Sequence, residues 1–208
     1  WVTLPFNLLI YGINDIFDQE TDNINARKGG YEGAHISPNE VKPIWWGVLL
    51  TNLPFLGYFA LTLPWQATAW MLAYALFFTF YSAPPLRLKA RAYLDSFSNT
   101  DYAFPLAFVP LALGKEPIWL AVFALMAWSI AKHAYDAIQD IPQDSDTGIV
   151  TTAVHLGVKK TLIWCGFWWA VATVLFAMVN VPVAFVNLLI SGYLVLKVWQ
   201  NPTPKVAH

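Results

Sequence analysis

Two long segments without charge constrain this chain more than any other feature. Residues 43–83 contain no Asp, Glu, Lys or Arg, and the same is true of residues 161–196. A helix that crosses the hydrocarbon core of a bilayer needs about 20 mostly apolar residues. Each segment is therefore long enough for two spans. A proline-containing turn divides each segment, at Leu63-Pro64 and at Val181-Pro182. The sequence predicts two membrane hairpins, the first with spans of roughly 43–63 and 65–83.

Three further apolar segments add to these hairpins. Residues 117–131 open a span that stays uncharged until Lys132, and residues 102–114 predict a shorter, tilted span that begins near Phe97. Residues 1–13 are apolar but too short, so we interpret them as the end of a span whose beginning is missing. We expect an all-α, polytopic membrane helix bundle with six complete spans and one truncated span. The expected organisation is a single domain, residues 1–208, in a lipid bilayer.

The composition supports this class and excludes others. Only 12% of the residues are charged, whereas soluble domains carry about 25%. The net charge of −1 provides no basic surface for nucleic acid. The only cysteine, Cys165, excludes a disulfide scaffold or a thiolate metal site. No nucleic-acid partner is expected, and the sequence does not indicate an oligomeric state.

The few charges are concentrated on one side of the predicted bundle. That side receives the connections 14–42, 84–101 and 140–160 and the C-terminal tail. It holds ten of the twelve basic residues, which the positive-inside rule assigns to the cytoplasm. Among the thirteen acidic residues, only Glu116 lies on the opposite side. Because acids share this bias, we expect chemistry on the cytoplasmic face of the cell membrane.

One acidic cluster follows the first apolar segment. On a continuing helix, Asp15, Asp18 and Asp22 lie at i, i+3 and i+7, on one face, with Asn14 beside them. Carboxylates of like charge repel at this spacing. A hard divalent cation offsets that repulsion, and Mg²⁺ prefers carboxylate oxygens and bridges to phosphates.

A second acidic cluster lies at the end of the span that contains Lys132. Asp136, Asp140 and Asp144 are spaced four residues apart. Lys132 precedes Asp136 by four residues, which predicts an ion pair along the helix. The Asn-Asp-Ile of the first cluster resembles Gln-Asp-Ile around Asp140. This similarity indicates an internal duplication that places both clusters on the same side.

Two other interpretations of the acidic clusters are less favoured. A single acidic run after a span is commonly a solvated loop, but two related runs at two helix ends argue against that. A cation transporter needs acids within its spans and exposed to both sides. Here the far halves of the spans contain none, so a path through the bundle is not predicted.

Three motifs together resemble the UbiA-type intramembrane prenyltransferases over essentially the whole chain. The first motif is Asn14-Asp15-x-x-Asp18-x-x-x-Asp22. The second is Asp136-x-x-x-Asp140-x-x-x-Asp144, followed by residues 148–157. The third, Tyr81-Ser-Ala-Pro-Pro-Leu-Arg-Leu-Lys89, is similar to the loop between the family's fourth and fifth helices.

The resemblance implies a fold, a cofactor and a reaction. The family has nine helices around a central cavity, and this chain corresponds to about seven of them, without the first and the last. Two Mg²⁺ ions and a prenyl diphosphate donor are implied. The reaction is transfer of the prenyl group to a hydrophobic acceptor with release of diphosphate.

The resemblance also implies roles for the motif residues. The expected catalytic residues are Asp15, Asp18, Asp140 and Tyr81. The expected Mg²⁺ ligands are Asp15, Asp18, Asp22, Asp140 and Asp144. The expected substrate-binding residues are Asn14, Arg87, Lys89, Arg91 and Asp136. Arginine offers a fork that matches phosphate geometry and lysine a point charge, whereas Tyr81 offers an aromatic face to an allylic cation.

Details of the motifs are most similar to the lycopene elongase branch, which attaches a dimethylallyl unit to the end of lycopene. These details include Leu94-Asp95-Ser96 and His133-x-x-x-Ala137-Ile138. Lycopene is accordingly the expected acceptor. The alternatives are an aromatic-ring prenyltransferase of quinone or chlorophyll biosynthesis and a non-catalytic lipid-binding relative. The sequence does not identify the base that removes a proton from the acceptor.

Overall fold

The computed structural model describes residues 1, 3–22 and 35–207, and it describes side chains at 1, 3–19 and 35–207. All regular secondary structure in this described part is helical. The chain forms two compact units, Trp1–Arg87 and Leu88–His208, which are described separately below. The expected single domain stays a prediction.

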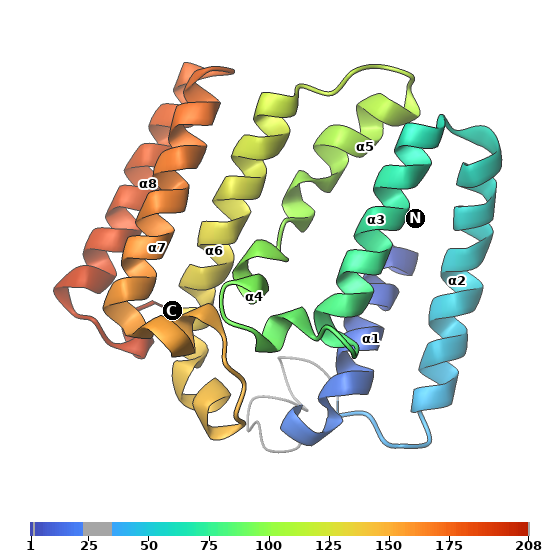
Figure 1. Ribbon diagram of the computed structural model, residues 1–208, viewed down its shortest axis with the longest axis horizontal. Helices are drawn as coiled ribbons and strands as arrows, with labels where there is room; N and C mark the ends of the chain where they lie inside the picture. The colour runs from blue at the N-terminus through green and yellow to red at the C-terminus, as the bar shows by residue number, and fades with distance from the viewer. Residues whose placement is uncertain (2, 23–34, 208) are drawn as a thin grey trace. The chain divides into compact units, whose positions relative to one another are not determined.

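The N-terminal unit contains three helices. They are α1 (Leu4–Asp22), α2 (Val41–Thr62) and α3 (Trp65–Ser82) (Figure 1). Helices α2 and α3 form the first predicted hairpin. Their connection is short because Leu63 is extended and Pro64, which lacks a backbone N–H, precedes the first turn of α3. Helix α1 packs against both helices of the hairpin.

Close packing and one buried amide hold α1 to α2. A Cβ atom at Gly12 on α1 would lie 3.0 Å from Ile44 Cγ2, so glycine permits the two helices to approach closely. The Nδ2 of the buried Asn52 donates to the Pro5 carbonyl at 2.7 Å, and its Oδ1 accepts from Trp1 Nε1 at 2.8 Å. Such polar contacts fix the packing of apolar helices where hydrophobicity alone provides no direction.

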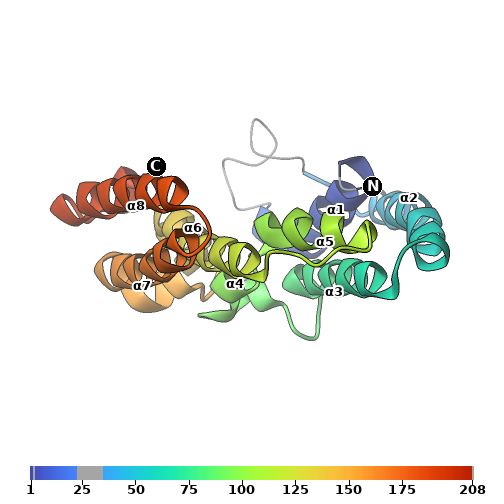
Figure 2. The same ribbon diagram turned by 90° about the horizontal axis from the view of Figure 1, so that it is seen from above.

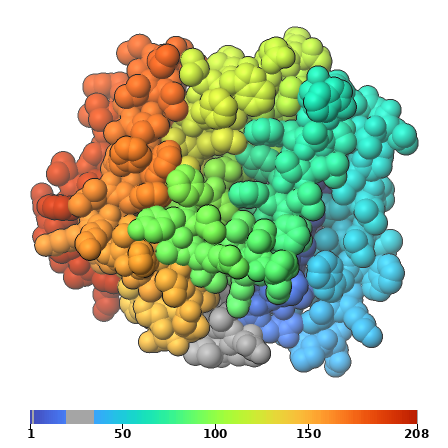
Figure 3. All heavy atoms as spheres, viewed as in Figure 1, coloured from blue at the N-terminus to red at the C-terminus, as the bar shows by residue number. Residues whose placement is uncertain are grey.

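The C-terminal unit is built on α6 (Trp119–Asp146), α7 (Thr152–Ala177) and α8 (Val181–Gln200). Helix α7 packs against both α6 and α8, as the view from above shows (Figure 2). In the space-filling view, α7 lies in front of α8 and covers much of it (Figure 3). Asn180 caps α8 by accepting from the Val183 amide at 3.1 Å, so the second predicted hairpin has a defined turn.

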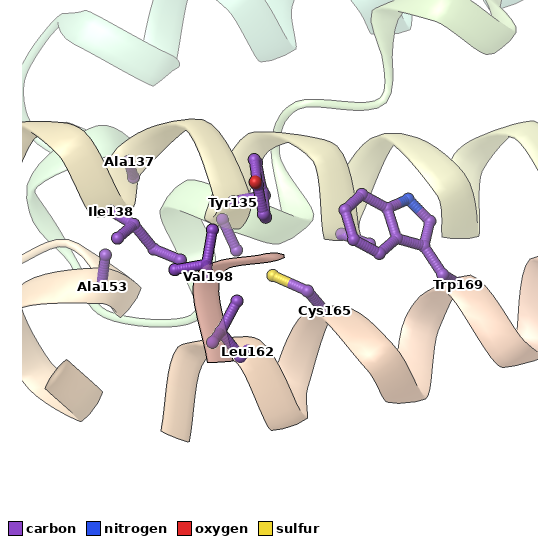
Figure 4. Packing of buried hydrophobic residues seen from close by; sticks show 10 residues of the cluster. Tyr135, Ala137, Ile138, Ala153, Leu162, Cys165, Trp169 and Val198 are labelled. Atoms are coloured by element: carbon purple, nitrogen blue, oxygen red, sulfur yellow. The ribbon is translucent and has the colours of Figure 1, made fainter. Parts of the chain in front are cut away.

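The core of this unit lies between α6 and α7. Tyr135 and Ile138 of α6 face Leu162, Cys165 and Trp169 of α7 (Figure 4). These side chains fix the contact face of α6, and the acidic residues near its end lie outside this core. Cys165 is buried in the core, as a small hydrophobic side chain would be.

The prediction of a tilted span is wrong about where its helix begins. Instead of a helix that begins near Phe97, the structure has α4 (Leu94–Phe97), the 3₁₀ helix η2 (Asp101–Ala103) and α5 (Phe104–Ala112). Ser98 donates from Oγ to the Asp95 carbonyl, a local bond that competes with helix continuation. Helix α5 has nine residues and is about 14 Å long, which is less than the hydrocarbon thickness of about 30 Å.

Three helices in the described part are long and apolar enough to cross a membrane: α2, α7 and α8. Their length and apolar composition are those of helices in an integral membrane protein. The remaining spans of the predicted six stay predictions.

Helix α7 contains a break that only glycine accommodates. At Gly157 the backbone adopts φ 71° and ψ 167°, which separates the first turn of α7 from the rest. This conformation is essentially restricted to glycine. The break lets residues 151–156 turn away from the axis of the long part of α7.

We expect Gly157→Ala to lower the free energy of unfolding by about 1–3 kcal/mol, because a Cβ strains this conformation. Thermal unfolding of the detergent-solubilised protein measures the effect. Gly166→Ala is the matched control on the same helix, since Gly166 has no positive φ and nothing within 4 Å of the added Cβ. Equal melting temperatures for the two variants would contradict the interpretation.

Candidate functional site

In the N-terminal unit, the predicted acidic residues lie in the last turns of α1. Asp15 and Asp18 are three residues apart on this helix, on neighbouring positions of one face. Asp18 is buried, with 8% of its surface exposed. Asn14 Oδ1 accepts a hydrogen bond from Ser82 Oγ at 2.9 Å, which fixes the amide at the end of α3. The side chain of Asp22, a predicted ligand, lies outside the described residues.

Arg87 reaches Asp18 because the chain turns sharply after α3. The turn includes the cis Pro84–Pro85 bond, and the Arg87 amide donates to the Ala83 carbonyl at 3.0 Å. Arg87 Nη2 then lies 3.7 Å from Asp18 Oδ1. This distance is an ion pair rather than a hydrogen bond.

The Arg87 guanidinium retains donor capacity. Its Nε is buried and has no hydrogen-bond partner. Guanidinium N–H groups are matched to carboxylate and phosphate oxygens. An unsatisfied buried donor beside a carboxylate therefore fits a site that receives an anionic ligand together with a cation. Tyr81 lies half-buried in the last turn of α3.

In the C-terminal unit, Asp136, Asp140 and Asp144 follow one face of α6. Pro142 does not end the helix, which continues to Asp146. Asp136 Oδ2 pairs with Lys132 Nζ, which confirms the predicted i, i+4 ion pair.

The turn between α6 and α7 orients Asp144. Asp144 Oδ2 accepts from Thr151 Oγ1 at 3.3 Å, and its backbone carbonyl accepts from the Ile149 amide at 2.8 Å. Gly148, with a φ of 72°, makes this tight turn possible. Asp144 is thus fixed by the residues that precede α7.

The predicted basic residues 89 and 91 lie at the start of the C-terminal unit. Lys89 belongs to the 3₁₀ helix η1 (Leu88–Ala90) and is only 8% exposed, whereas Arg91 is exposed. A buried lysine is costly unless it has polar partners, which makes Lys89 the more constrained of the two.

The motifs do not indicate the role of Asp95, which is fully buried on α4. Its Oδ2 accepts from the Thr152 amide at 3.0 Å and its Oδ1 from Thr152 Oγ1. The Tyr93 amide in turn donates to Thr152 Oγ1 at 2.8 Å. Burial raises the pKa of the Asp95 carboxyl, and the hydrogen bonds from Thr152 oppose that shift.

Asp95 ties the loop with Lys89 to the start of α7. Because Thr151 binds Asp144 and Thr152 binds Asp95, two adjacent residues connect the basic loop with the acidic end of α6. The Thr-Thr pair before a helix is a recognisable capping signal, and Thr151 does accept from the Val154 amide at 3.3 Å. Their partners, Asp144 and Asp95, have no comparable signal in the sequence.

The available donors fit Mg²⁺ chemically. The predicted ligands are all carboxylates, which are hard oxygen donors. Among the residues with described side chains, no group of three or more His, Cys, Asp and Glu gathers at one metal position. The predicted ligands include Asp22 and are divided between the two units. The Mg²⁺ positions therefore stay predictions.

Known proteins show extensive similarity to this chain. The sequence profile of the UbiA prenyltransferase family matches residues 1–206. A lycopene elongase/hydratase of Halobacterium salinarum is 38% identical over 93% of this chain and 68% of its own length. One of Haloferax volcanii is 36% identical over 85% of this chain and 58% of its length. The chain thus spans between half and three quarters of these relatives.

The fold is also similar to a solved structure. A UbiA homologue of Archaeoglobus fulgidus, solved with DMAPP and Mg²⁺, superposes with a TM-score of 0.71 at 21% identity. The match covers 89% of this chain and 67% of the other. The predicted all-α fold class is confirmed.

We expect Thr152→Val to lower the free energy of unfolding by about 1.5–3 kcal/mol, because a hydrogen bond to a buried carboxylate is lost. The melting temperature in detergent reports the loss. Thr62→Val is a matched control, since the exposed Thr62 hydroxyl donates only to the Tyr58 carbonyl of its own helix. A Thr152 variant as stable as this control would show that the Asp95 contact does not hold the loop.

Proposed function

Because the chain belongs to the UbiA prenyltransferase family, we propose that it transfers a prenyl group from an isoprenyl diphosphate to a hydrophobic acceptor and releases diphosphate. The observation that carries this proposal is the pair formed by the buried Asp18 and Arg87. It places a metal-binding type of side chain next to an arginine whose Nε lacks a hydrogen-bond partner. Leaving diphosphate requires both a cation and hydrogen-bond donors.

Two Mg²⁺ ions are proposed to bind at the two helix ends. Asp15, Asp18 and Asp22 on α1 hold one ion, and Asp140 and Asp144 on α6 hold the other. When bound, the ions neutralise the diphosphate and stabilise the charge that develops on it as it leaves. Hydrogen bonds orient residues at both helix ends: Ser82 holds Asn14, which precedes the proposed ligand Asp15, and Thr151 holds the proposed ligand Asp144. Such hydrogen bonds orient ligands and raise metal affinity.

The basic residues of the loop after α3 are proposed to bind the diphosphate. Arg87 offers its fork to the oxygens, and Lys89 adds a charge, with Arg91 in a supporting role. The contact between Asp95 and Thr152 keeps the Lys89 loop in place. Tyr81 presents an aromatic ring to the allylic cation that forms when diphosphate departs.

Lycopene is the proposed acceptor, and dimethylallyl diphosphate is the proposed donor. The relatives named above are lycopene elongase/hydratases, and the solved relative was bound to DMAPP and Mg²⁺. Attack of an acceptor double bond on the allylic cation leaves a tertiary carbocation on the acceptor. That cation ends either by losing a proton, which gives an alkene, or by adding water, which corresponds to hydration.

The site is proposed to face the cytoplasm at the cell membrane. Basic residues are concentrated on the side that carries the acidic helix ends, and such residues are retained inside. The bilayer interior supplies the exclusion of water that the allylic cation requires.

We expect Asp18→Asn and Asp140→Asn, tested separately, to lower prenyl transfer by more than about 100-fold, because each removes a charged Mg²⁺ ligand. Membranes containing the protein are incubated with dimethylallyl diphosphate, lycopene and saturating Mg²⁺. Mass spectrometry then measures the addition of one prenyl unit. Removal of Mg²⁺ with a chelator should abolish the addition in the unsubstituted protein.

Asp146→Asn serves as the control, because Asp146 is exposed at the end of the same helix and has no predicted role. Undiminished transfer in either test variant would refute the two-metal proposal. Transfer to an aromatic acid but not to lycopene would refute the proposed acceptor and leave the reaction type standing.

A further inference from the structure

Lys132 and Asp136 form a charged cluster in α6 that the proposed metal and diphosphate sites do not use. Lys132 Nζ pairs with Asp136 Oδ2 and lies 5.6 Å from the centre of the Tyr102 ring. The Tyr102 ring packs edge-on against Trp128, with ring centroids 5.7 Å apart. The ammonium is thus held between a carboxylate and an aromatic face, both of which stabilise a cation.

The pair lies within α6, which is uncharged from Trp119 to Ala131. Ionisable residues within membrane helices are rare, pair with each other and mark functional positions. Both side chains are partly exposed, and an i, i+4 contact between such groups contributes little to stability. Stability alone therefore does not account for the pair, which points to a chemical role.

The position of Asp136 differs from that of the proposed Mg²⁺ ligands. It lies one helical turn before Asp140, which is about 6 Å further from the polar end of α6. The prenyl chain and the hydrocarbon acceptor belong on the apolar side of the diphosphate. Asp136 is therefore the carboxylate of α6 closest to the depth at which the acceptor reacts.

The Asp136 side chain is also accessible to solvent, whereas Asp95 is fully buried. The Asp136 side chain is 43% exposed and that of Lys132 is 35% exposed. The carboxylate therefore has room to meet a bound molecule. Because Lys132 Nζ pairs with Asp136 Oδ2, the negative charge of this carboxylate is already balanced without a metal ion.

We propose that the Asp136 carboxylate takes the proton that the prenylated acceptor loses, and that Lys132 is the positioning residue that keeps it ionised. The inference rests on the proposed prenyl transfer. In that reaction the donor C–O bond breaks and its electron pair leaves with diphosphate. An acceptor double bond supplies the pair for the new C–C bond, which leaves a carbocation on the acceptor.

Asp136 then resolves this carbocation. The C–H bond next to the cationic carbon breaks, the proton passes to an oxygen of Asp136, and the electron pair forms a new double bond. No oxidant or reductant is needed. The carboxylate later releases the proton to water. A positioned base contributes roughly 10²–10⁴-fold to such a step.

The test measures which product the carbocation gives, and not only the rate of prenyl transfer. Membranes with each variant receive dimethylallyl diphosphate, lycopene and Mg²⁺. Mass spectrometry separates the alkene product from the hydrated product, which is heavier by one water. We expect Asp136→Asn to lower the ratio of alkene to hydrated product at least about tenfold. The Mg²⁺ concentration that gives half-maximal diphosphate release should stay the same as in the unsubstituted protein.

Conservative variants separate chemistry from structure. Asp136→Glu retains a carboxylate and should recover much of the alkene ratio. Lys132→Met should lower the ratio, whereas Lys132→Arg should restore it, because the positive charge next to Asp136 is kept. Asp146→Asn on the same helix is the control and should give the unsubstituted ratio. A purely structural role for the pair would not follow this order.

Each contrary outcome has a distinct meaning. An unchanged alkene ratio in Asp136→Asn overturns the inference, as does an unsubstituted enzyme that makes only hydrated product. A higher Mg²⁺ requirement in Asp136→Asn, without a change in the ratio, would make Asp136 a metal ligand instead. Absence of any prenylated lycopene in the unsubstituted protein refutes the proposed function itself.

Discussion

The need to compensate carboxylates at the ends of apolar helices governs this structure. A bilayer provides no water for an unpaired charge, so each acidic residue near a span needs a partner from the protein or a ligand. Asp18 has Arg87, Asp144 has the Thr151 hydroxyl, Asp95 has Thr152 and Asp136 has Lys132. Arg87, Thr151 and Thr152 lie where the backbone turns or where a helix begins, whereas Lys132 lies within α6. At the first three positions, the compensation of charge determines which loops must be rigid.

These partners also divide the carboxylates by chemistry. Asp95 accepts bonds from uncharged donors, is fully buried and serves the architecture of the loop. Asp18 faces a guanidinium at 3.7 Å, which is an ion pair longer than a hydrogen bond. In the same unit as Asp95, Asp136 is compensated by an ammonium and stays accessible. Residues of one type thus acquire different roles from what they contact, which a motif alone cannot specify.

The sequence predicts the parts of this fold that depend on local chemistry. The two hairpins follow from uncharged segments divided by prolines, and the pair of Lys132 and Asp136 follows from helical spacing. The prediction of the tilted span fails because the Ser98 hydrogen bond and the 3₁₀ turn at 101–103 interrupt the helix. Hydropathy does not distinguish such an interruption from a continuous helix. The contact between Asp95 and Thr152 joins residues 57 positions apart and depends on how α4 meets α7. No local sequence pattern predicts a contact between residues so far apart in the chain.

The acidic motifs alone also leave the proton acceptor undetermined. Spacing places Asp136, Asp140 and Asp144 on one face of α6 as equivalent residues. Only their contacts separate them: Asp144 is oriented by Thr151 near the polar end, and Asp136 is balanced by Lys132 two turns earlier. A carboxylate that binds Mg²⁺ is a weak base, because the metal competes for the lone pairs that a proton needs. A carboxylate paired with an ammonium keeps a second oxygen for that task. The order of residues along α6, from the ammonium to the proposed base to the proposed metal ligands, therefore follows the order in which a hydrocarbon acceptor and a diphosphate would lie beside the helix.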